Sequence, residues 1–200
     1  MASTLGANGE LDPAAVCAAA GLEGEAAAVL RQLSPTTGAG VRTAVDALVT
    51  RDLLGDAARL LAHALPPRES VWWAWWCARR ALGPDAPDAA AASRALAAAE
   101  QWIAQPTDQH RRAALAAAEV VGSATPAGCA GLAAFLSGGS IAPAGAPHTA
   151  APPFLVAKVV TGGVMLAAAA PSAAQSTERY QLFIAQGLEV GRRIGLWASA

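Results

Sequence analysis

Histidine, cysteine and acidic side chains most often carry catalysis or bind metal ions, and in this chain they are few and scattered. The three histidines are His63, His110 and His148. None belongs to an HxxxH or HExxH pair, the spacing that places two zinc ligands on one face of a helix. The fifteen acidic residues contain no DxD-type cluster for magnesium. The sequence therefore predicts no metal site.

Possible nucleophiles also lack the neighbours that would activate them. Cys17, Cys77 and Cys129 lie far apart without a CxxC pair, so we expect small, buried apolar residues rather than a disulfide framework. No GxSxG turn is present, and a catalytic site needs a nucleophile, a base and an orienting group together. The SGGS stretch at residues 137–140 could cradle an anion, but a flexible loop is the more common use of such a sequence. We predict neither an enzyme nor a bound cofactor.

The most unusual local feature is the segment VWWAWWCARR at residues 71–80, which holds four of the six tryptophans. At 100° per residue, a helix over residues 68–82 places Trp73 and Trp75 on a broad apolar side. The opposite, narrow sector holds Glu69, Trp72, Trp76, Arg79 and Arg80. Either of these arginines can lie over the second indole of the sector, because residues three and four apart are neighbours on a helix.

Two interpretations of the narrow sector remain open. In the first, Trp72 and Trp76 pack beneath a neighbouring helix, and Arg79 and Arg80 form a solvated fringe. In the second, the four residues are a partner-binding patch, since tryptophan and arginine are the types most enriched at binding hot spots. The second interpretation predicts that Trp72 and Trp76 are more exposed than the other two tryptophans of the segment.

Gly187, Gly191 and Gly195 recur every four residues and form one smooth stripe on a helix predicted over residues 176–198. Each glycine inside a helix costs about 1 kcal/mol relative to alanine, so a close contact should offset the loss. We expect that contact to come from the alanine-rich residues 154–170 of the same chain. A seam between two copies in a homo-oligomer is the alternative.

Proline and glycine divide the chain into about eight helices without a repeat. Asp12 with Pro13, and Thr125 with Pro126, are typical pairs of an N-cap and a first-turn proline. Residues 156–160 are the only short strand candidate, and a helix is favoured there too. We predict an all-α fold, an irregular multi-helix bundle or short helical array, in one domain over residues 1–200. Residues 1–10 are a predicted flexible N-terminus, and residues 137–153 a long, mobile Gly/Pro/Ala loop.

The composition excludes several classes of protein. Hydrophobic residues make up 54% of the chain, but the excess is mostly alanine, which favours tightly packed helices over a membrane span. The net charge is -1, so no basic surplus is present to bind nucleic acid. The distant, unpaired cysteines fit a reducing cytoplasm best.

Several segments together resemble an uncharacterised bacterial family of about this length, some of whose members carry the label "twin-arginine translocation pathway signal" protein. The segments are VWWA at 71–74 with CAR at 77–79, RRAALAAAE at 111–119, PAG at 126–128, FLSGGSIAP at 135–143, PPFL at 152–155 with Lys158, ERY at 178–180 and GLEV at 187–190. The resemblance implies an α-helical protein without established catalytic residues, encoded near type VI secretion and phage-tail-like gene clusters. The paired arginines Arg111 and Arg112 lie deep in the chain, where an export signal cannot work.

These observations favour a cytoplasmic, non-enzymatic protein–protein interaction protein, an adaptor or chaperone accessory to a type VI secretion or phage-tail-like system. Its predicted contact surfaces are the sector of Trp72, Trp76, Arg79 and Arg80, and the loop at residues 137–150. The alternatives are a small-molecule binder with a tryptophan-lined pocket between helices and an enzyme with a hidden site. An enclosed pocket beside Trp73 or Trp102 favours the binder, and an exposed flat patch favours the interaction protein. Convergent histidine and carboxylate groups favour the enzyme.

Overall fold

The computed structural model describes residues 13–33, 40–83, 88–143, 145–170 and 173–197, and within them every regular element is helical. The predicted all-α class is therefore correct, with ten α-helices in the described residues where the sequence predicts about eight. They are α1 (Pro13–Ala20), α2 (Gly24–Gln32), α3 (Val41–Thr50), α4 (Leu54–Ala64), α5 (Pro67–Ala81), α6 (Ala89–Ala104), α7 (Asp108–Val121), α8 (Pro126–Leu136), α9 (Leu155–Ala169) and α10 (Ser176–Arg193), the last preceded by the 3-10 helix η2 (Ala173–Gln175). The predicted flexible N-terminus, residues 1–10, lies outside the described residues.

Helix boundaries follow from local capping chemistry. The Thr107 hydroxyl accepts a hydrogen bond from the backbone N–H of His110 at 3.2 Å, and the Thr125 hydroxyl accepts one from Gly128 at 3.0 Å. Each satisfies one of the first N–H groups of a helix, which have no partner inside it. Both α5 and α8 have proline in their first turn, where the missing N–H costs no hydrogen bond.

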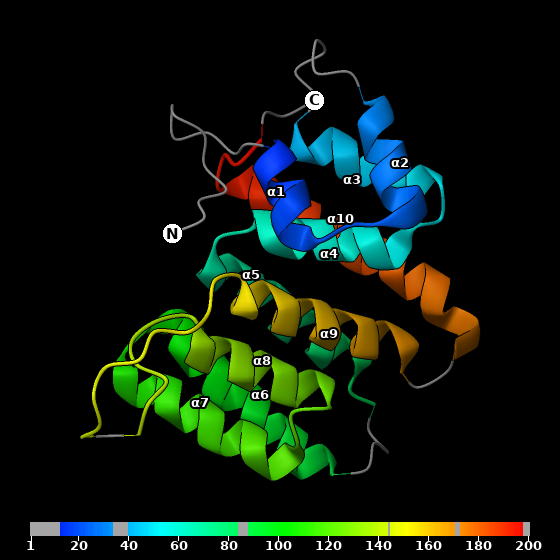
Figure 1. Cartoon of the computed structure of the whole chain (residues 1–200). Coiled ribbons are helices and arrows are strands. Elements are labelled where there is room, and N and C mark those ends of the chain that lie inside the picture. Colours follow the sequence, from blue (N-terminus) through cyan, green and yellow to red (C-terminus); the bar gives the residue numbers. More distant parts are fainter. Residues whose placement is uncertain (1–12, 34–39, 84–87, 144, 171–172, 198–200) are drawn as a thin grey trace.

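The helices stack in layers, with α5 and α9 in the middle (Figure 1). Helices α1 to α4 and α10 lie on one side of this middle layer, and α6, α7 and α8 lie on the other. The larger group of buried residues joins the first side to the middle layer and also includes Trp102, Ala114, Ala133 and Ala134 from the other side. A smaller group, built mostly of alanine, lies between α5, α6 and α8. The fold therefore holds one large core and an adjoining core of small side chains.

Small residues allow α8 to be enclosed by its neighbours. The buried residues of α8 are Ala127, Gly128, Cys129, Ala130, Gly131, Ala133, Ala134 and Phe135. A Cβ added to Gly131 would lie 2.7 Å from the carbonyl oxygen of Ala114 in α7. One added to Gly163 in α9 would lie 2.8 Å from the Cβ of Cys129. Because both distances are shorter than van der Waals contact, these helices approach to a separation that needs glycine.

The three glycines near the C-terminus have three different roles. A Cβ on Gly187 would lie 2.5 Å from Leu61 Cδ2 in α4 and 2.9 Å from Trp73 Cε2 in α5. Gly191 is covered by the indole of Trp197. The predicted packing of this stripe against residues 154–170 is therefore wrong, because α4 and α5 supply the contact at Gly187. Gly187 and Gly191 are both buried by this chain itself, which leaves neither exposed for a seam with a second copy.

Helix α10 ends earlier than the predicted residue 198 because a Schellman turn stops it. Gly195 has a left-handed φ of +70°, and the backbone N–H of Leu196 donates to the carbonyl of Gly191 at 2.8 Å. The turn brings Trp197 back onto the helix, where its Nε1–H donates to the carbonyl of Leu188 at 3.1 Å. Gly195 is thus the stop signal of α10 and not a third member of a packing stripe.

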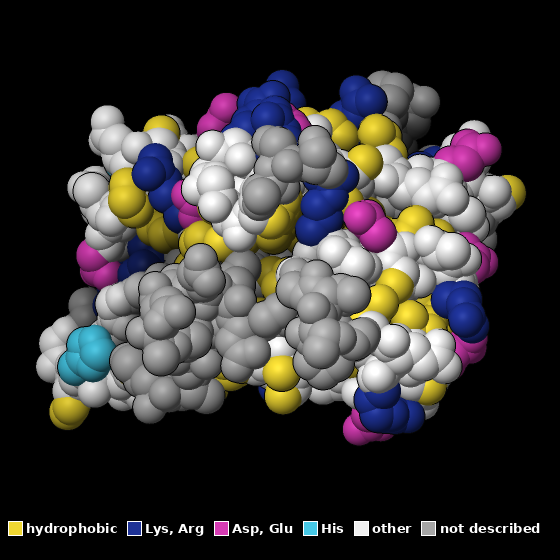
Figure 2. Space-filling view, turned by 90° about the horizontal axis from the view of Figure 1, so that it is seen from above, with side chains coloured by type: hydrophobic (Ala, Val, Ile, Leu, Met, Phe, Trp, Pro, Cys, Tyr) yellow, Lys and Arg dark blue, Asp and Glu magenta, His cyan; other side chains and the backbone are white. Residues whose placement is uncertain are grey.

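The surface mixes charge types. Seen from above in Figure 2, Lys and Arg side chains alternate with Asp, Glu and hydrophobic side chains over the described part of this face. This part of the face offers no extended basic region of the kind that binds a phosphate backbone. None of the helices in the described residues combines the length and hydropathy needed to span a bilayer.

The role of Gly187 is tested by adding one methyl group. Gly187→Ala should destabilise the protein by about 1–3 kcal/mol, because it overpacks the contact with Leu61 and Trp73. Gly162 in α9 is a matched control, since a Cβ there meets nothing within 4 Å. Gly162→Ala should stabilise the protein by up to about 1 kcal/mol through helix propensity. Urea unfolding followed by circular dichroism measures both, and equal effects would contradict the role given to Gly187.

Candidate functional site

Helix α5 divides its four tryptophans between the core and the surface. Trp73 is 0% exposed, and its Nε1–H donates to the carbonyl of Phe183 in α10 at 2.8 Å. Trp72, Trp75 and Trp76 are only partly buried. The placement of Trp75 on the buried side was therefore wrong. Its indole packs at the edge of the smaller core, where its Nε1–H donates to a backbone carbonyl of α6 at 3.1 Å.

The last two turns of α5 carry two stacked pairs of tryptophan and arginine. Arg79 Cζ lies 5.7 Å from the ring centroid of Trp75, and Arg80 Cζ lies 5.4 Å from that of Trp76. The sequence predicts one such contact, at Trp76, and the structure forms that contact and a second with the same spacing of four. Both arginines are exposed, and neither pairs with a carboxylate among the described residues.

Ring contacts link each of these pairs to a further aromatic side chain. The centroids of Trp72 and Trp75 lie 6.4 Å apart in a tilted arrangement. Trp76 meets Phe183 edge to face at 6.0 Å, which ties the surface to α10. We call the set of Trp72, Trp75, Trp76, Arg79 and Arg80 the Trp–Arg surface.

A pocket of about 350 Å³ lies beside Trp72, where the start of α5 meets the ends of α6 and α10. It is lined by Arg68, Glu69, Trp72, Ile103, Gln186, Val190, Arg193 and Ile194. This volume is at the lower end of the range of small-molecule pockets and also accommodates a side chain of a partner. Trp73 and Trp102, the walls that the sequence suggests for a pocket, are both buried in the core instead.

Positive and negative groups balance at the pocket. Arg68 Nε donates to the carbonyl of Ile103 at 2.8 Å, so this cation caps the end of α6, where unpaired carbonyls favour positive charge. The neighbouring Glu69 makes no ion pair with a described residue. On the α10 wall, Arg193 Nε lies 2.8 Å from Glu189 Oε1. Hydrogen bonds from Arg192, and then from Arg193, lower the pKa of Glu189 to about 2.

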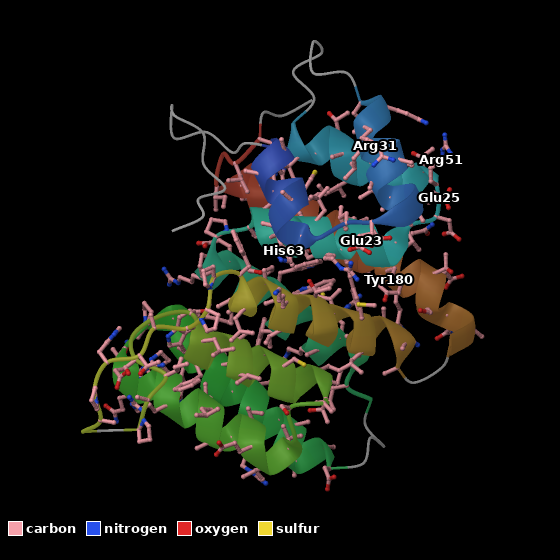
Figure 3. The ribbon with its side chains drawn as sticks, in the orientation of Figure 1. Glu23, Glu25, Arg31, Arg51, His63 and Tyr180 are labelled. Atoms are coloured by element: carbon pink, nitrogen blue, oxygen red, sulfur yellow. The ribbon has the colours of Figure 1, made fainter. Side chains whose placement is uncertain are left out.

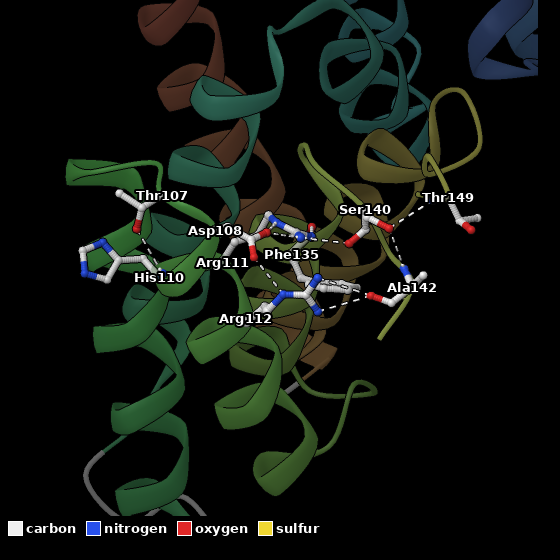
Figure 4. A network of polar contacts seen from close by, with 9 residues as sticks. All are labelled: Thr107, Asp108, His110, Arg111, Arg112, Phe135, Ser140, Ala142 and Thr149. Carbon is white, nitrogen blue, oxygen red and sulfur yellow. Dashed lines mark hydrogen bonds and ion pairs between the residues drawn. The ribbon is translucent and has the colours of Figure 1, made fainter. Parts of the chain in front are cut away.

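The paired arginines of α7 hold the segment between α8 and α9 (Figure 4). Arg111 is 3% exposed, and its guanidinium donates to the carbonyls of Phe135 at 2.7 Å and Ser140 at 2.9 Å. Its Cζ lies 4.6 Å from the Phe135 ring centroid. Asp108 accepts hydrogen bonds from Arg111 and from Arg112, and these contacts lower its pKa.

We call the contacts of Arg111 with Asp108, Phe135 and Ser140 the Arg111 clamp. Further hydrogen bonds extend these contacts into the segment itself. Both terminal nitrogens of Arg112 donate to the carbonyl of Ala142 at 3.3 Å. The Ser140 hydroxyl accepts from the backbone N–H of Thr149 at 3.0 Å, and the Ile141 N–H donates to the Thr149 carbonyl at 2.8 Å. The two arginines thus act inside the fold, as anchors of residues 135–149.

Groups that might do chemistry stand apart from one another. Among the described residues, no group of three or more His, Cys, Asp or Glu side chains is placed to hold a metal ion. Burial raises the pKa of the Cys77 and Cys129 thiols, which disfavours the reactive thiolate. His63 in α4 (Figure 3) is buried, with Nδ1 2.8 Å from the Arg59 carbonyl and Nε2 without a partner. Burial, opposed by that hydrogen bond, lowers its pKa, and Lys158 and Arg59 lower it further.

Sequence reasoning missed most of the pocket wall. Ile103, Gln186, Val190 and Ile194 come from α6 and from the end of α10, and only the packing of these helices on α5 reveals them. The stack of Arg79 on Trp75, in contrast, has a signal in the sequence, because it repeats the spacing of four already noted for its neighbours.

A family model described as a family of unknown function, DUF6931, matches residues 44–191. The matched part begins within α3 and includes all of α5 and the Arg111 clamp. It ends at Gly191, so α1, α2 and Trp197 lie outside it. No curated protein and no solved structure gives a match.

Removal of the buried guanidinium tests the clamp. Arg111→Met should destabilise the protein by about 1–3 kcal/mol, because it removes the donors to the buried Phe135 carbonyl and the partly buried Ser140 carbonyl. The amide of Ile141 should then exchange with solvent faster, as followed by hydrogen-exchange mass spectrometry. Arg112→Met is the matched control, since that side chain is 33% exposed and its bonds to the segment are longer. Equal exchange in the two variants would contradict the clamp.

Proposed function

This chain belongs to DUF6931, a family of unknown function, and we propose that it is a non-enzymatic protein–protein interaction protein. The observation that supports this proposal is the Trp–Arg surface, where three partly buried indoles lie under or beside two exposed guanidinium groups that form no ion pair with a described residue. A partner that covers these rings would bury a large apolar area and exclude water from the arginines, as binding hot spots do.

We further propose that the protein acts in the cytoplasm as an adaptor or chaperone for a component of a type VI secretion or phage-tail-like system. This part of the proposal rests on the resemblance of segments such as VWWA at 71–74 and FLSGGSIAP at 135–143. The segment at residues 137–150 is the second proposed contact surface, presented on the anchors formed by Arg111 and Arg112.

A small-molecule binder is the second candidate, and the 350 Å³ pocket beside Trp72 favours it. Such a ligand would be flat or apolar enough to lie against the indole, with a polar group for Glu69 or Arg193. Denaturation of the protein purified from its own cells, followed by mass spectrometry of the released compounds, tests this candidate. A stoichiometric compound that Trp72→Ala loses would support it over the interaction protein.

Co-purification tests the leading proposal. The tagged protein is purified from cells that naturally make it, beside a Trp72→Ala/Trp76→Ala variant and an Arg79→Gln/Arg80→Gln variant that keeps every tryptophan. Secretion-system proteins should co-purify with the natural protein and be depleted with both variants, because each variant changes two of the five residues of the Trp–Arg surface.

The control is Val120→Ala, which changes a side chain that is 72% exposed in α7 and outside the proposed site. Circular dichroism confirms that each variant keeps its helices. Recovery of the same proteins with all four forms would refute the proposed surface. Partners that depend on the surface but belong to no secretion system would refute only the secretion assignment.

A further inference from the structure

The two arginines of the Trp–Arg surface differ from the two arginines at the end of α10. Arg192 and Arg193 at the end of α10 share Glu189 as an ion-pair partner. Arg79 and Arg80 occupy the equivalent last turn of α5 but have only indole rings as described partners. A guanidinium stacked on a ring keeps the N–H groups at its edge for a planar, bidentate acceptor such as a carboxylate.

Charge is distributed unevenly along this face of α5. At the pocket end, Glu69 and Glu189 lie beside Arg68, Arg192 and Arg193. At the other end, roughly 15 Å away along the helix at 1.5 Å per residue, Arg79 and Arg80 have no acidic counterpart among the described residues. The rings of Trp72 and Trp75, 6.4 Å apart, bridge the two ends.

We infer that the Trp–Arg surface binds an acidic segment of a protein partner, with an apolar side chain in the Trp72 pocket and carboxylates on Arg79 and Arg80. This inference rests on the proposed function. It adds the charge of the partner segment and the direction in which that segment lies along α5. Glu69 repels a carboxylate at the pocket end, so the acidic residues lie toward the end of α5. The mixed surface charges and the net charge of -1 favour a short acidic peptide segment as the ligand over a polyanion such as a nucleic acid.

Photo-crosslinking in the cells that naturally make the protein tests the inference. A photoreactive amino acid replaces Leu182, which is 44% exposed on α10 and one helical turn before the pocket residue Gln186. Mass spectrometry then reads the sequence of the crosslinked segment. We expect clustered aspartate or glutamate next to a large apolar residue. The same photoreactive group at Val120 on α7 is the positional control and should not capture that segment.

Charge reversal provides the second arm. Arg79→Glu/Arg80→Glu should lower the yield of the adduct about tenfold, because two attractive pairs become repulsive. Lysine in place of the acidic residues of the partner segment should restore the yield. Arg31→Glu/Arg51→Glu makes the same change in net charge on exposed arginines of α2 and the end of α3 (Figure 3) and should leave the yield unchanged.

The outcomes separate this inference from the proposed function. An adduct whose segment lacks acidic residues, or whose yield survives the reversal at Arg79 and Arg80, overturns the acidic-segment inference and leaves the interaction surface in place. Absence of any protein adduct at position 182 overturns both. An adduct that forms equally from position 120 marks non-specific capture and also overturns both.

Discussion

The contact between the Trp73 indole and Gly187 determines how α5 and α10 lie against each other, and the candidate site depends on it. Because Gly187 has no side chain, the indole and Leu61 occupy the space that a Cβ would need. The hydrogen bond from Trp73 Nε1 to the Phe183 carbonyl fixes the rotation of α5 as well as its distance from α10. Because that side of α5 packs into the core, Trp72 and Trp76 lie at the border with α10, and the pocket forms beside Trp72.

The small size of most core side chains explains why so many indoles remain at the surface. Helices α7, α8 and α9 meet largely through alanine and glycine, and at Gly131 and Gly163 they approach more closely than a Cβ would allow. The core between α5, α6 and α8 is likewise mostly alanine. Of the four tryptophans of α5, only Trp73 is fully buried, and the other three lie at the edges of the cores. The partly exposed rings of three tryptophans in α5 are thus a consequence of how tightly the other helices pack.

The sequence predicts the parts of this structure that local chemistry controls. A capping threonine, a first-turn proline and helical periodicity are local, and they place the start of α8 and the all-α class correctly. The stack of Arg80 on Trp76 is local as well, since it lies within one helical turn. The helices that pack against the glycine stripe could not be predicted from local sequence, because the contact depends on which helices meet in space. Trp75 was misplaced for the same reason, since small residues of α6 and α8 decide its burial.

Trp73 serves the fold, whereas we propose that Trp72 serves binding. Urea unfolding of Trp73→Ala and Trp72→Ala, compared with the natural protein, tests this claim most directly. Trp73→Ala should cost about 3–5 kcal/mol, as for other fully buried aromatic side chains. Trp72→Ala should cost about 1 kcal/mol, because its ring is partly exposed and borders an open pocket. Equal losses of unfolding free energy in the two variants would make Trp72 a core residue and contradict the account.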